Sequence, residues 1–561
     1  MRVLFVNPIY PERPRGIFPM GLAYVAGSLC AEGHDVKILD TDGECVSEKE
    51  LRKTIREGKF DIIGTGGLIT AYNHIKWIIS LVKEIRPDIP VMVGGGGASS
   101  VPLMFLEKTK ADIVVVGEGE NTVLEILKIL NNGGNLSEVK GICFKEQGAI
   151  YQNCTAGPIE NIDNLPFPKW DLFQIETYIQ ANLKPNGIRS MPIFASRSCP
   201  YPCNFCFHPI GKKYRSRSNQ NILDEIKYLI ATYNIQHIQF VDELFIFDKK
   251  QIIGFCELLL REKVNIPWTC ASRTNIADIE MYKIMKKAGC TNFQYGIESG
   301  STEMLKSMKK NETVEGAKKA INIARAAGFE PLTTFMIGTI GENDRTISET
   351  VEFIKEMNLH IGAFFFTTPY PGTEIYDWSI KEGLVRNEEK FIMSLSNAVK
   401  YTINLTKLSD WKLIKLKCNA EKEVISYYNK NNVPKIISID NKTKHNIKLK
   451  IQCLLPKCGN IFSVEICTQQ LTKCPYCGKN IFLNRTLLLK HLGIKWYLDS
   501  LLDNFIDIKS IKTLGLRGLF MRLYTKTLEK FAYNAVCVYL SSRPIIRFVL
   551  SIVRTKKYWE N

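Results

Sequence analysis

The chain has 561 residues, of which 45% are hydrophobic and 23% are charged, as in ordinary globular proteins. This length exceeds what one hydrophobic core usually fills, so we expect about two to four domains. No apolar run reaches the roughly 18–20 residues that a membrane-spanning helix needs, and the first residues lack the apolar stretch and cleavage site of a signal peptide. These features argue against an integral membrane or secreted protein, and we expect a cytoplasmic one.

The net charge of +17 is concentrated near the C-terminus. From Arg485 onward the chain has 14 Lys and Arg against 5 Asp and Glu, a net +9. Leu, Ile, Phe and Trp are interleaved with these basic residues in 483–561. This pattern predicts a basic amphipathic helical tail that packs on the rest of the protein, and peripheral contact with an anionic membrane is the alternative. Nucleic-acid binding is disfavoured because no RNA-binding module is recognisable.

Residues 1–135 alternate between short apolar strands and helical patterns. The expected strands are Val3–Asn7, Val36–Leu39, Asp61–Gly64, Val91–Val93 and Ile113–Val116, and the expected helices are Gly21–Glu32, Ile75–Ile85 and Glu120–Leu130. This alternation predicts an α/β domain with a doubly wound parallel sheet, whose ligands bind at the carboxyl ends of the strands. Glycine gathers at three of those ends, where it lets a ligand approach the backbone closely. No dinucleotide fingerprint follows the first strand, which disfavours NAD.

The rest of the chain divides into further regions. Residues 136–190 look like a connector, because Asn164–Trp170 is proline-rich. Residues 191–390 alternate again, with expected strands Pro192–Ala195, His237–Val241, Trp268–Ala271, Asn292–Gly296, Pro331–Ile337 and Ala363–Thr367. Strand–helix units of this kind predict an open or partial barrel. Residues 391–447 are expected to form a helical linker, ahead of an α-rich C-terminal region that includes a second cysteine cluster in 448–482.

Cys199, Cys203 and Cys206 follow the first expected barrel strand with C-x3-C-x2-C spacing. The chain has 17 cysteines and no export signal, so a disulfide framework is not expected. Three closely spaced thiolates suit a cubic iron–sulfur cluster, and three ligands leave one iron open to a substrate or cofactor, as catalytic metal sites do. The alternative is three core cysteines or part of a zinc site, for which no fourth ligand is obvious, although His208 is close.

The segment Ser196–Phe207 resembles the signature of the radical S-adenosylmethionine (SAM) superfamily. The resemblance implies a [4Fe–4S] cluster on the three cysteines, whose open iron chelates the amino and carboxylate groups of SAM. Electron transfer from the cluster then gives a 5′-deoxyadenosyl radical. The aromatic residue before the third cysteine, Phe205, is expected to shield the cluster near the adenine.

Other positions, within about residues 190–380, match the same superfamily. The resemblance implies that Asp242 and Glu243 accept hydrogen bonds from the SAM ammonium, and a carboxylate beside a cation makes physical sense there. It implies that Arg273 pairs with the methionine carboxylate, that Glu298 holds the ribose hydroxyls, and that Gly338 lies near the adenine. No catalytic residue is assigned.

The first domain resembles the cobalamin-binding domain that is fused to one branch of radical SAM enzymes. The resemblance implies that cobalamin contacts the following residues: Gly21, Gly66, Gly67, Gly94, Gly95, Gly117 and Glu118. His34 and His74 are the only histidines in residues 1–140, and neither lies in an Asp-x-His-x-x-Gly segment. A protein histidine is therefore not expected to ligate cobalt, which leaves that face of the metal open to methyl transfer. A degenerate domain that only packs on the barrel is the alternative.

The second cysteine cluster consists of two knuckles, each followed by glycine, and its four cysteines are Cys453, Cys458, Cys474 and Cys477. This spacing predicts a structural zinc ribbon with a closed coordination shell. An auxiliary iron–sulfur cluster is the alternative, and Cys467 is a competing ligand between the two pairs.

Together the resemblances imply a cobalamin-dependent radical SAM methyltransferase. Methylcobalamin would pass a methyl group to an unactivated carbon after the deoxyadenosyl radical removes its hydrogen. A radical SAM oxidative cyclase, or another radical enzyme that uses cobalamin differently, is the alternative. A non-catalytic cobalamin sensor or carrier and a transfer-RNA methylthiotransferase rank lower. The expected partners are a small-molecule or lipid-like substrate and an electron donor such as flavodoxin or ferredoxin.

Overall fold

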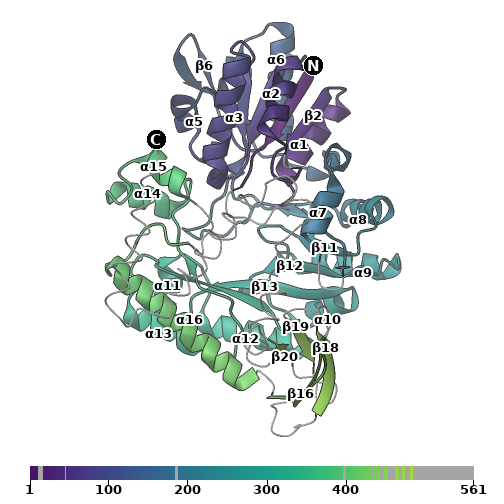
Figure 1. The fold of residues 1–561 in the computed structure, drawn as a ribbon, viewed down its shortest axis with the longest axis vertical. Coiled ribbons are helices and arrows are strands. Elements are labelled where there is room, and N and C mark those ends of the chain that lie inside the picture. Colours follow the sequence, from purple (N-terminus) through teal and green to yellow (C-terminus); the bar gives the residue numbers. More distant parts are fainter. Residues whose placement is uncertain are drawn as a thin grey trace. The chain divides into compact units, whose positions relative to one another are not determined.

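The computed structural model describes residues 1–10, 17–44, 46–183, 187–395, 400–432, 435–442, 447–452, 461–466, 470–473 and 480–483. Two compact units make up the chain, and each is described by itself. The first comprises Met1–Thr346 with Gly362–Lys407, and the second comprises Ile347–Ile361 with Leu408–Asn561. Both the glycine-rich domain and the cysteine motif belong to the first unit (Figure 1).

The first unit begins with a seven-stranded sheet in the order β2-β1-β3-β4-β5-β6-β7. Its strands are β1 (Arg2–Asn7), β2 (Asp35–Asp40), β3 (Ile62–Gly66), β4 (Val91–Gly94), β5 (Ile113–Val115), β6 (Ile142–Glu146) and β7 (Ala149–Gln152). Its helices are α1 (Met20–Ala31), α2 (Glu48–Glu57), α3 (Tyr72–Ile85), α4 (Gly95–Ser100), α5 (Pro102–Lys108) and α6 (Gly119–Asn132). Strands β1 to β5 pair in parallel, which confirms the predicted doubly wound core.

Helix α3 shows why this sequence folds as it does. Its apolar residues recur at helical spacing, and Ile75, Ile78, Ile79 and Val82 are all buried. They pack in one core with residues of β3 and β4. The order of the parallel strands reverses between β1 and β3, so the ends of these two strands form the topological switch point where ligands of such folds bind.

The sheet continues past residue 135 into the segment predicted as a connector. Strands β6 and β7 add to β5 in antiparallel pairing, so the sheet is mixed. The turn between them has Gln147 and Gly148 at φ of 49° and 85°, which suits a two-residue hairpin. All four residues of β7 are exposed. The apolar stretch of β7, Ala149–Tyr151, is short and does not alternate with polar residues as a half-buried strand does, so the hairpin escaped the sequence analysis.

A second sheet follows, with the order β15-β14-β13-β12-β11-β8. Its strands are β8 (Ser190–Ile193), β11 (His237–Phe240), β12 (Trp268–Ser272), β13 (Cys290–Glu298), β14 (Leu332–Ile337) and β15 (Phe365–Phe366). Every neighbouring pair is parallel, so the predicted partial barrel of six strands is confirmed. We call this sheet with its helices the barrel.

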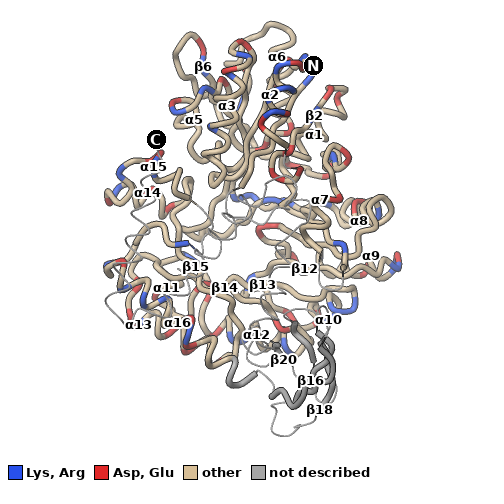
Figure 2. Tube along the Cα trace, in the orientation of Figure 1, with Lys and Arg blue, Asp and Glu red and all other residues tan. Residues whose placement is uncertain are grey.

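The helices of this region carry most of its charge. They are α7 (Ile175–Ala181), α8 (Asn219–Tyr233), α9 (Lys249–Arg261), α10 (Ile279–Lys287), α11 (Thr302–Ser307), α12 (Val314–Ala326), α14 (Glu374–Lys381) and α15 (Glu388–Ser394), whereas α13 (Asp344–Glu356) belongs to the second unit from Ile347 onward. Figure 2 shows basic and acidic residues interspersed along outer helices such as α8 and α9. Their apolar faces are buried, for example at Leu223 and Ile226 of α8.

The second unit contains α16 (Asp410–Asn432), which lies within the predicted helical linker, 391–447. The end of that linker forms a strand, Lys435–Lys442, and the described residues after it are strands in place of the expected helices. Two antiparallel sheets follow, built from β16 (Lys435–Lys442), β17 (Ile447–Gln452), β18 (Ile461–Ile466), β19 (Gln470–Lys473) and β20 (Asn480–Leu483). The four cysteines of the expected zinc ribbon and the basic tail lie outside the described residues, so both stay predictions. Within the described part of the chain, no helix combines the length and the apolar character needed to cross a membrane.

Candidate functional site

The three cysteines of the first cluster lie on one loop, residues 198–214, which we call the cysteine loop. It is closed at its base by two short strands, β9 (Ser196–Arg197) and β10 (Arg215–Ser216), which pair in antiparallel fashion. The loop follows β8 directly, so the cysteines lie at the carboxyl end of the first barrel strand, as predicted. Cys203 is buried, Cys199 is half-buried and Cys206 is exposed. Phe205, between two of them, is half-buried.

The thiols of this loop are close enough to influence one another. Desolvation of the Cys206 thiol, together with the neighbouring Cys203 and Cys199, raises its pKa to about 12, although the residue as a whole is exposed. Burial raises the pKa of Cys199 too, and Cys203 adds to the effect. Three adjacent thiols therefore lose their protons only beside a cationic partner, and a bound metal is such a partner. The donor set fits an iron–sulfur cluster.

The ligands of an iron–sulfur cluster are arranged differently from those of a single metal ion. Among the described residues, no three His, Cys, Asp or Glu side chains converge closely enough to hold one metal ion. Each thiolate of a [4Fe–4S] cluster binds a different iron, so its ligands surround a cube and not a point.

Arg273 follows β12 and packs against the cysteine loop. Its guanidinium lies 3.7 Å from the ring centroid of Tyr201 and donates a hydrogen bond to the Cys203 sulfur at 3.5 Å. Its Nε lies 3.4 Å from a carboxylate oxygen of Glu312, and it also donates to the backbone carbonyl of Lys310. Arg273 thus braces the loop through contacts that the sequence analysis did not foresee, and its pairing with the methionine carboxylate stays a prediction.

Asp242 and Glu243, at the end of β11, have different surroundings. Asp242 is 5% exposed, and its Oδ1 accepts hydrogen bonds from Ala195 N at 2.9 Å, from Ser196 Oγ at 2.6 Å and from Ser196 N. It therefore fixes the strand that enters the cysteine loop. Burial raises its pKa to about 6 despite these bonds. Its Oδ2 is buried with no hydrogen-bond partner among the described residues, so one oxygen suits a ligand ammonium.

Glu243 is the more open of the two carboxylates. Its side chain is 37% exposed, and its Oε2 lies 3.9 Å from Nδ1 of His208. Burial and the neighbouring Asp242 raise its pKa to about 7. Both nitrogens of His208 are buried without a hydrogen-bond partner among the described residues. The end of β11 therefore presents two carboxylates beside the cysteine loop, which suits a polar, cationic ligand.

Glu298 is the last residue of β13, and Gly338 directly follows β14. Glu298 has φ of 71°, a left-handed conformation that costs a residue with a side chain about 1–3 kcal/mol. The pairing of β13 with β14 shifts at this point, and Glu298 Oε1 lies 4.0 Å from Nζ of Lys310. Gly338, at φ of 90°, donates its N–H to the buried carboxylate of Glu342. Backbone strain like that of Glu298 is typical of residues that bind ligands. The contacts of Glu298 and Gly338 with SAM stay predictions.

The predicted glycine cleft falls into two parts. At Gly66, a side-chain carbon would lie 2.1 Å from the carbonyl oxygen of Gly94, and at Gly95 it would lie 2.9 Å from the nitrogen of Gly67. These glycines allow backbone segments to pack on each other. Gly21 and Gly117, in contrast, border open space, since a side-chain carbon would meet nothing within 4 Å. Gly21 and Gly117 thus leave room beside the backbone, and the predicted contacts of these glycines with cobalamin stay predictions.

Glu118 makes ion pairs that the sequence analysis did not foresee. Its two carboxylate oxygens bind Arg197 at 2.5 Å and Arg215 at 2.6 Å, and its expected contact with cobalamin stays a prediction. Glu120 binds Arg197 as well, at 2.6 Å. The sequence analysis missed both arginines and Glu120, and the available signal was that the arginines flank the cysteines on either side.

Comparison with known proteins agrees with this geometry. The model of the radical SAM superfamily matches residues 193–354, and that of the B12 binding domain matches residues 13–127. The chain is 31% identical over 370 residues to an uncharacterized methyltransferase, PH0819, of Pyrococcus horikoshii, covering 65% of this chain and 79% of that protein. The chain belongs to the radical SAM enzymes that carry an N-terminal B12-binding domain.

Two further proteins resemble this chain, one in sequence and one in fold. The chain is 28% identical over 389 residues to the anaerobic magnesium-protoporphyrin IX monomethyl ester cyclase of Rubrivivax gelatinosus, covering 67% of this chain and 69% of the cyclase. Its fold resembles that of the methyltransferase TsrM of Kitasatospora setae, solved with cobalamin and a [4Fe–4S] cluster, with a TM-score of 0.58 and 18% identity over 68% of this chain and 75% of TsrM. The last similarity concerns the fold alone.

Proposed function

We propose that this enzyme is a cobalamin-dependent methyltransferase that acts on an unactivated carbon atom. The proposal rests on the 31% identity to a protein named as a methyltransferase, of which the match covers 79%. The cluster and SAM would supply a 5′-deoxyadenosyl radical, and cobalamin would carry the methyl group. An anaerobic cyclase is the second candidate, supported by the 28% identity to a protein of that activity.

The histidines of the first domain favour methyl transfer. His74 accepts a hydrogen bond from Ile9 N at 2.9 Å and stacks on Trp77, and burial lowers its pKa to about 4. His34 contacts the N-terminal amine at 3.2 Å. Both residues are engaged in local structure, and neither lies in the segment that ligates cobalt in other proteins. A cobalt face without a protein ligand suits exchange of a methyl group.

The side chains of the barrel have separate tasks in this proposal. The cysteine loop holds the cluster, and Arg273 stabilises the loop through Tyr201 and Cys203. Glu243 and the unpartnered oxygen of Asp242 would accept hydrogen bonds from the SAM ammonium. Other residues recognise the substrate, which we propose to be a small or lipid-like molecule. We propose a flavodoxin or a ferredoxin as the electron donor.

A substrate-free assay separates the two candidates. The full chain is reconstituted anaerobically with iron, sulfide and cobalamin, reduced with a low-potential reductant, and given SAM. A methyltransferase of this kind forms both 5′-deoxyadenosine, from the radical step, and S-adenosylhomocysteine, from transfer of the SAM methyl group to reduced cobalamin. A cyclase forms 5′-deoxyadenosine without S-adenosylhomocysteine. That result would replace the proposal with the second candidate.

A further inference from the structure

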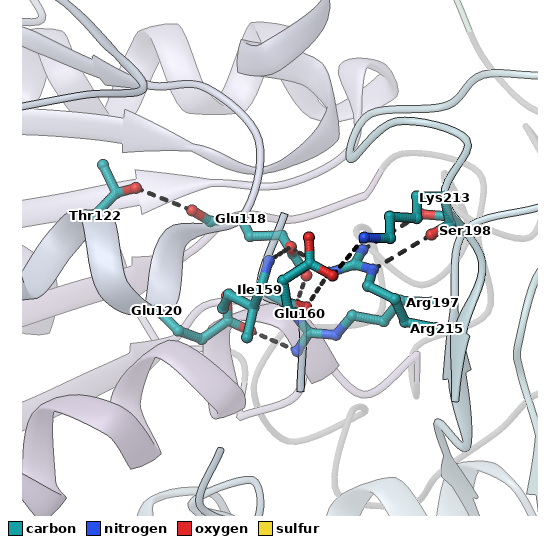
Figure 3. A network of polar contacts seen from close by, with 9 residues as sticks. All are labelled: Glu118, Glu120, Thr122, Ile159, Glu160, Arg197, Ser198, Lys213 and Arg215. Carbon is teal, nitrogen blue, oxygen red and sulfur yellow. Dashed lines mark hydrogen bonds and ion pairs between the residues drawn. The ribbon is translucent and has the colours of Figure 1, made fainter. Parts of the chain in front are cut away.

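An ion-pair network joins the B12-binding domain to the cysteine loop (Figure 3). One side of it is the segment Val116–Glu120, which follows β5 and which we call the acidic loop. The other side is the pair of strands β9 and β10, in which Arg197 and Arg215 are direct partners across the ladder. The two arginines therefore sit at the base of the loop that carries the three cysteines.

The bonds of this network are shared and directional. Arg197 uses its Nη1 for Glu118 at 2.5 Å and its Nη2 for Glu120 at 2.6 Å, so one guanidinium links both acids. Arg215 donates to Glu118 at 2.6 Å and to the backbone carbonyl of Ile159 at 2.7 Å. Glu118 also accepts the N–H of Ile159 at 2.7 Å. Planar guanidinium forks fix angles as well as distances.

Burial makes the network costly to build for stability alone. The four charged side chains are only 4–11% exposed. Burial raises the pKa of Glu118, but hydrogen bonds from Arg197 and Arg215 outweigh it and lower the pKa, so Glu118 stays ionised. Buried ion pairs stabilise a fold little better than apolar packing does, and their best-attested benefit is a unique geometry. The network is therefore suited to fixing the register of two parts.

The acidic loop also borders the open part of the glycine cleft. Gly117, with φ of 88° and open space beside it, directly precedes Glu118. A ligand beside Gly117 would therefore be held next to the residue that binds the base of the cysteine loop. Tyr24 of α1 adds to the same interface, because the Arg197 guanidinium lies 5.1 Å from its ring centroid and Arg217 donates to its hydroxyl at 3.5 Å.

We propose that Glu118 and Glu120 are positioning residues that set the placement of the cobalamin cleft relative to the cysteine loop, through Arg197 and Arg215. The proposal rests on the proposed function, because placement matters most when one methyl group must reach cobalt from a SAM molecule bound at the cluster. Displacement of about 1 Å between reacting groups can cost about a hundred-fold in rate.

The test uses two variants of the full chain and one control. Glu118→Gln keeps the shape of the side chain but removes its charge. Arg197→Lys keeps the charge but loses the fork that links two acids, and it serves if the first variant folds poorly. The control is Arg189→Lys, because Arg189 binds both oxygens of Glu176 with its fork, at 2.9 and 2.7 Å, away from the acidic loop.

The main readout is the ratio of two products formed from SAM without substrate. 5′-Deoxyadenosine needs only SAM at the cluster, whereas S-adenosylhomocysteine needs the methyl group to reach cobalt. In both test variants we expect S-adenosylhomocysteine to fall about ten-fold or more while 5′-deoxyadenosine stays within about two-fold of the wild type. The control should change neither. A proportional fall of both products, or no fall in either, would overturn the proposal.

A second readout keeps this proposal separate from the proposed function. If the wild type forms no S-adenosylhomocysteine, the methyl-transfer proposal fails, and amide hydrogen exchange of cobalamin-free, cluster-loaded protein decides the positioning role. Faster exchange in both the acidic loop and residues 196–216 of each test variant, but not of the control, supports the role. Unchanged exchange in these two segments refutes it.

Discussion

Glu342 offers a direct measure of what a buried carboxyl costs this fold. It is 3% exposed and follows β14, where its Oε2 accepts the N–H of Thr339 at 3.1 Å and that of Gly338. Burial raises its pKa from 4.5 to about 7, because the two hydrogen bonds offset only part of the lost hydration. Glu342→Gln keeps an oxygen acceptor for these donors and removes the ionisable group.

The sign of the effect follows from proton linkage. The folded protein holds this proton more tightly than the unfolded chain, so the carboxyl carries no penalty below about pH 4.5. The penalty grows as the pH rises from 4.5 to about 7 and is constant above that. At about 1.4 kcal/mol per pKa unit, the difference between 4.5 and about 7 amounts to about 3 kcal/mol. Glutamine should remove this cost.

The assay is urea unfolding of the wild type and of Glu342→Gln, followed by circular dichroism from about pH 5 to about pH 8. The free energy of unfolding of the variant, minus that of the wild type, should rise by about 2.5 kcal/mol over this interval, because a small part of the penalty is already present at about pH 5. Glu382→Gln, at an exposed position after α14, is the matched control. A difference that stays constant with pH, or falls as pH rises, would refute the reasoning.

Three other outcomes follow from the described contacts. Cys203→Ala should lose most reconstituted iron and 5′-deoxyadenosine formation, whereas Cys154→Ala, at an exposed position outside the cysteine loop, should keep both; equal iron in the two proteins would contradict the cluster assignment. Asp242→Ala should lower the free energy of unfolding by about 1–3 kcal/mol, because it leaves the buried donors of Ala195 and Ser196 without an acceptor, and an unchanged melting temperature would speak against this role. Gly95→Ala should cost at least about 1–2 kcal/mol in urea unfolding, since its φ of 83° suits glycine, and a neutral effect would show that the backbone can relax.

The strands of both sheets could be predicted from sequence because buried parallel strands are short apolar runs between helices. Strand β1 was expected at Val3–Asn7 and spans Arg2–Asn7, and β12 was expected at Trp268–Ala271 and spans Trp268–Ser272. The hairpin of β6 and β7 was missed because β7 is exposed along its whole length. Its pairing depends on a two-residue turn and on backbone hydrogen bonds, which leave little trace in the hydropathy pattern.

The cysteine loop could be predicted because ligands spaced closely along the chain need no knowledge of the tertiary fold. The partners of Glu118 could not, since Arg197 and Arg215 are 79 and 97 residues away in sequence. For the same reason the sequence did not reveal that Asp242 anchors Ser196 while Glu243 stays more open. Residue type and position at a strand end indicate a site. Which side chain anchors the loop and which stays open to a ligand depends on packing.

The location of Arg197 and Arg215 limits how this enzyme can be re-engineered by recombination. A B12-binding domain grafted from a relative whose acidic loop lacks the two glutamates would cover two buried guanidinium groups without neutralising them. Such a chimera would be expected to misassemble even if each half folded, and restoring carboxylates at the positions of Glu118 and Glu120 would be the minimal repair.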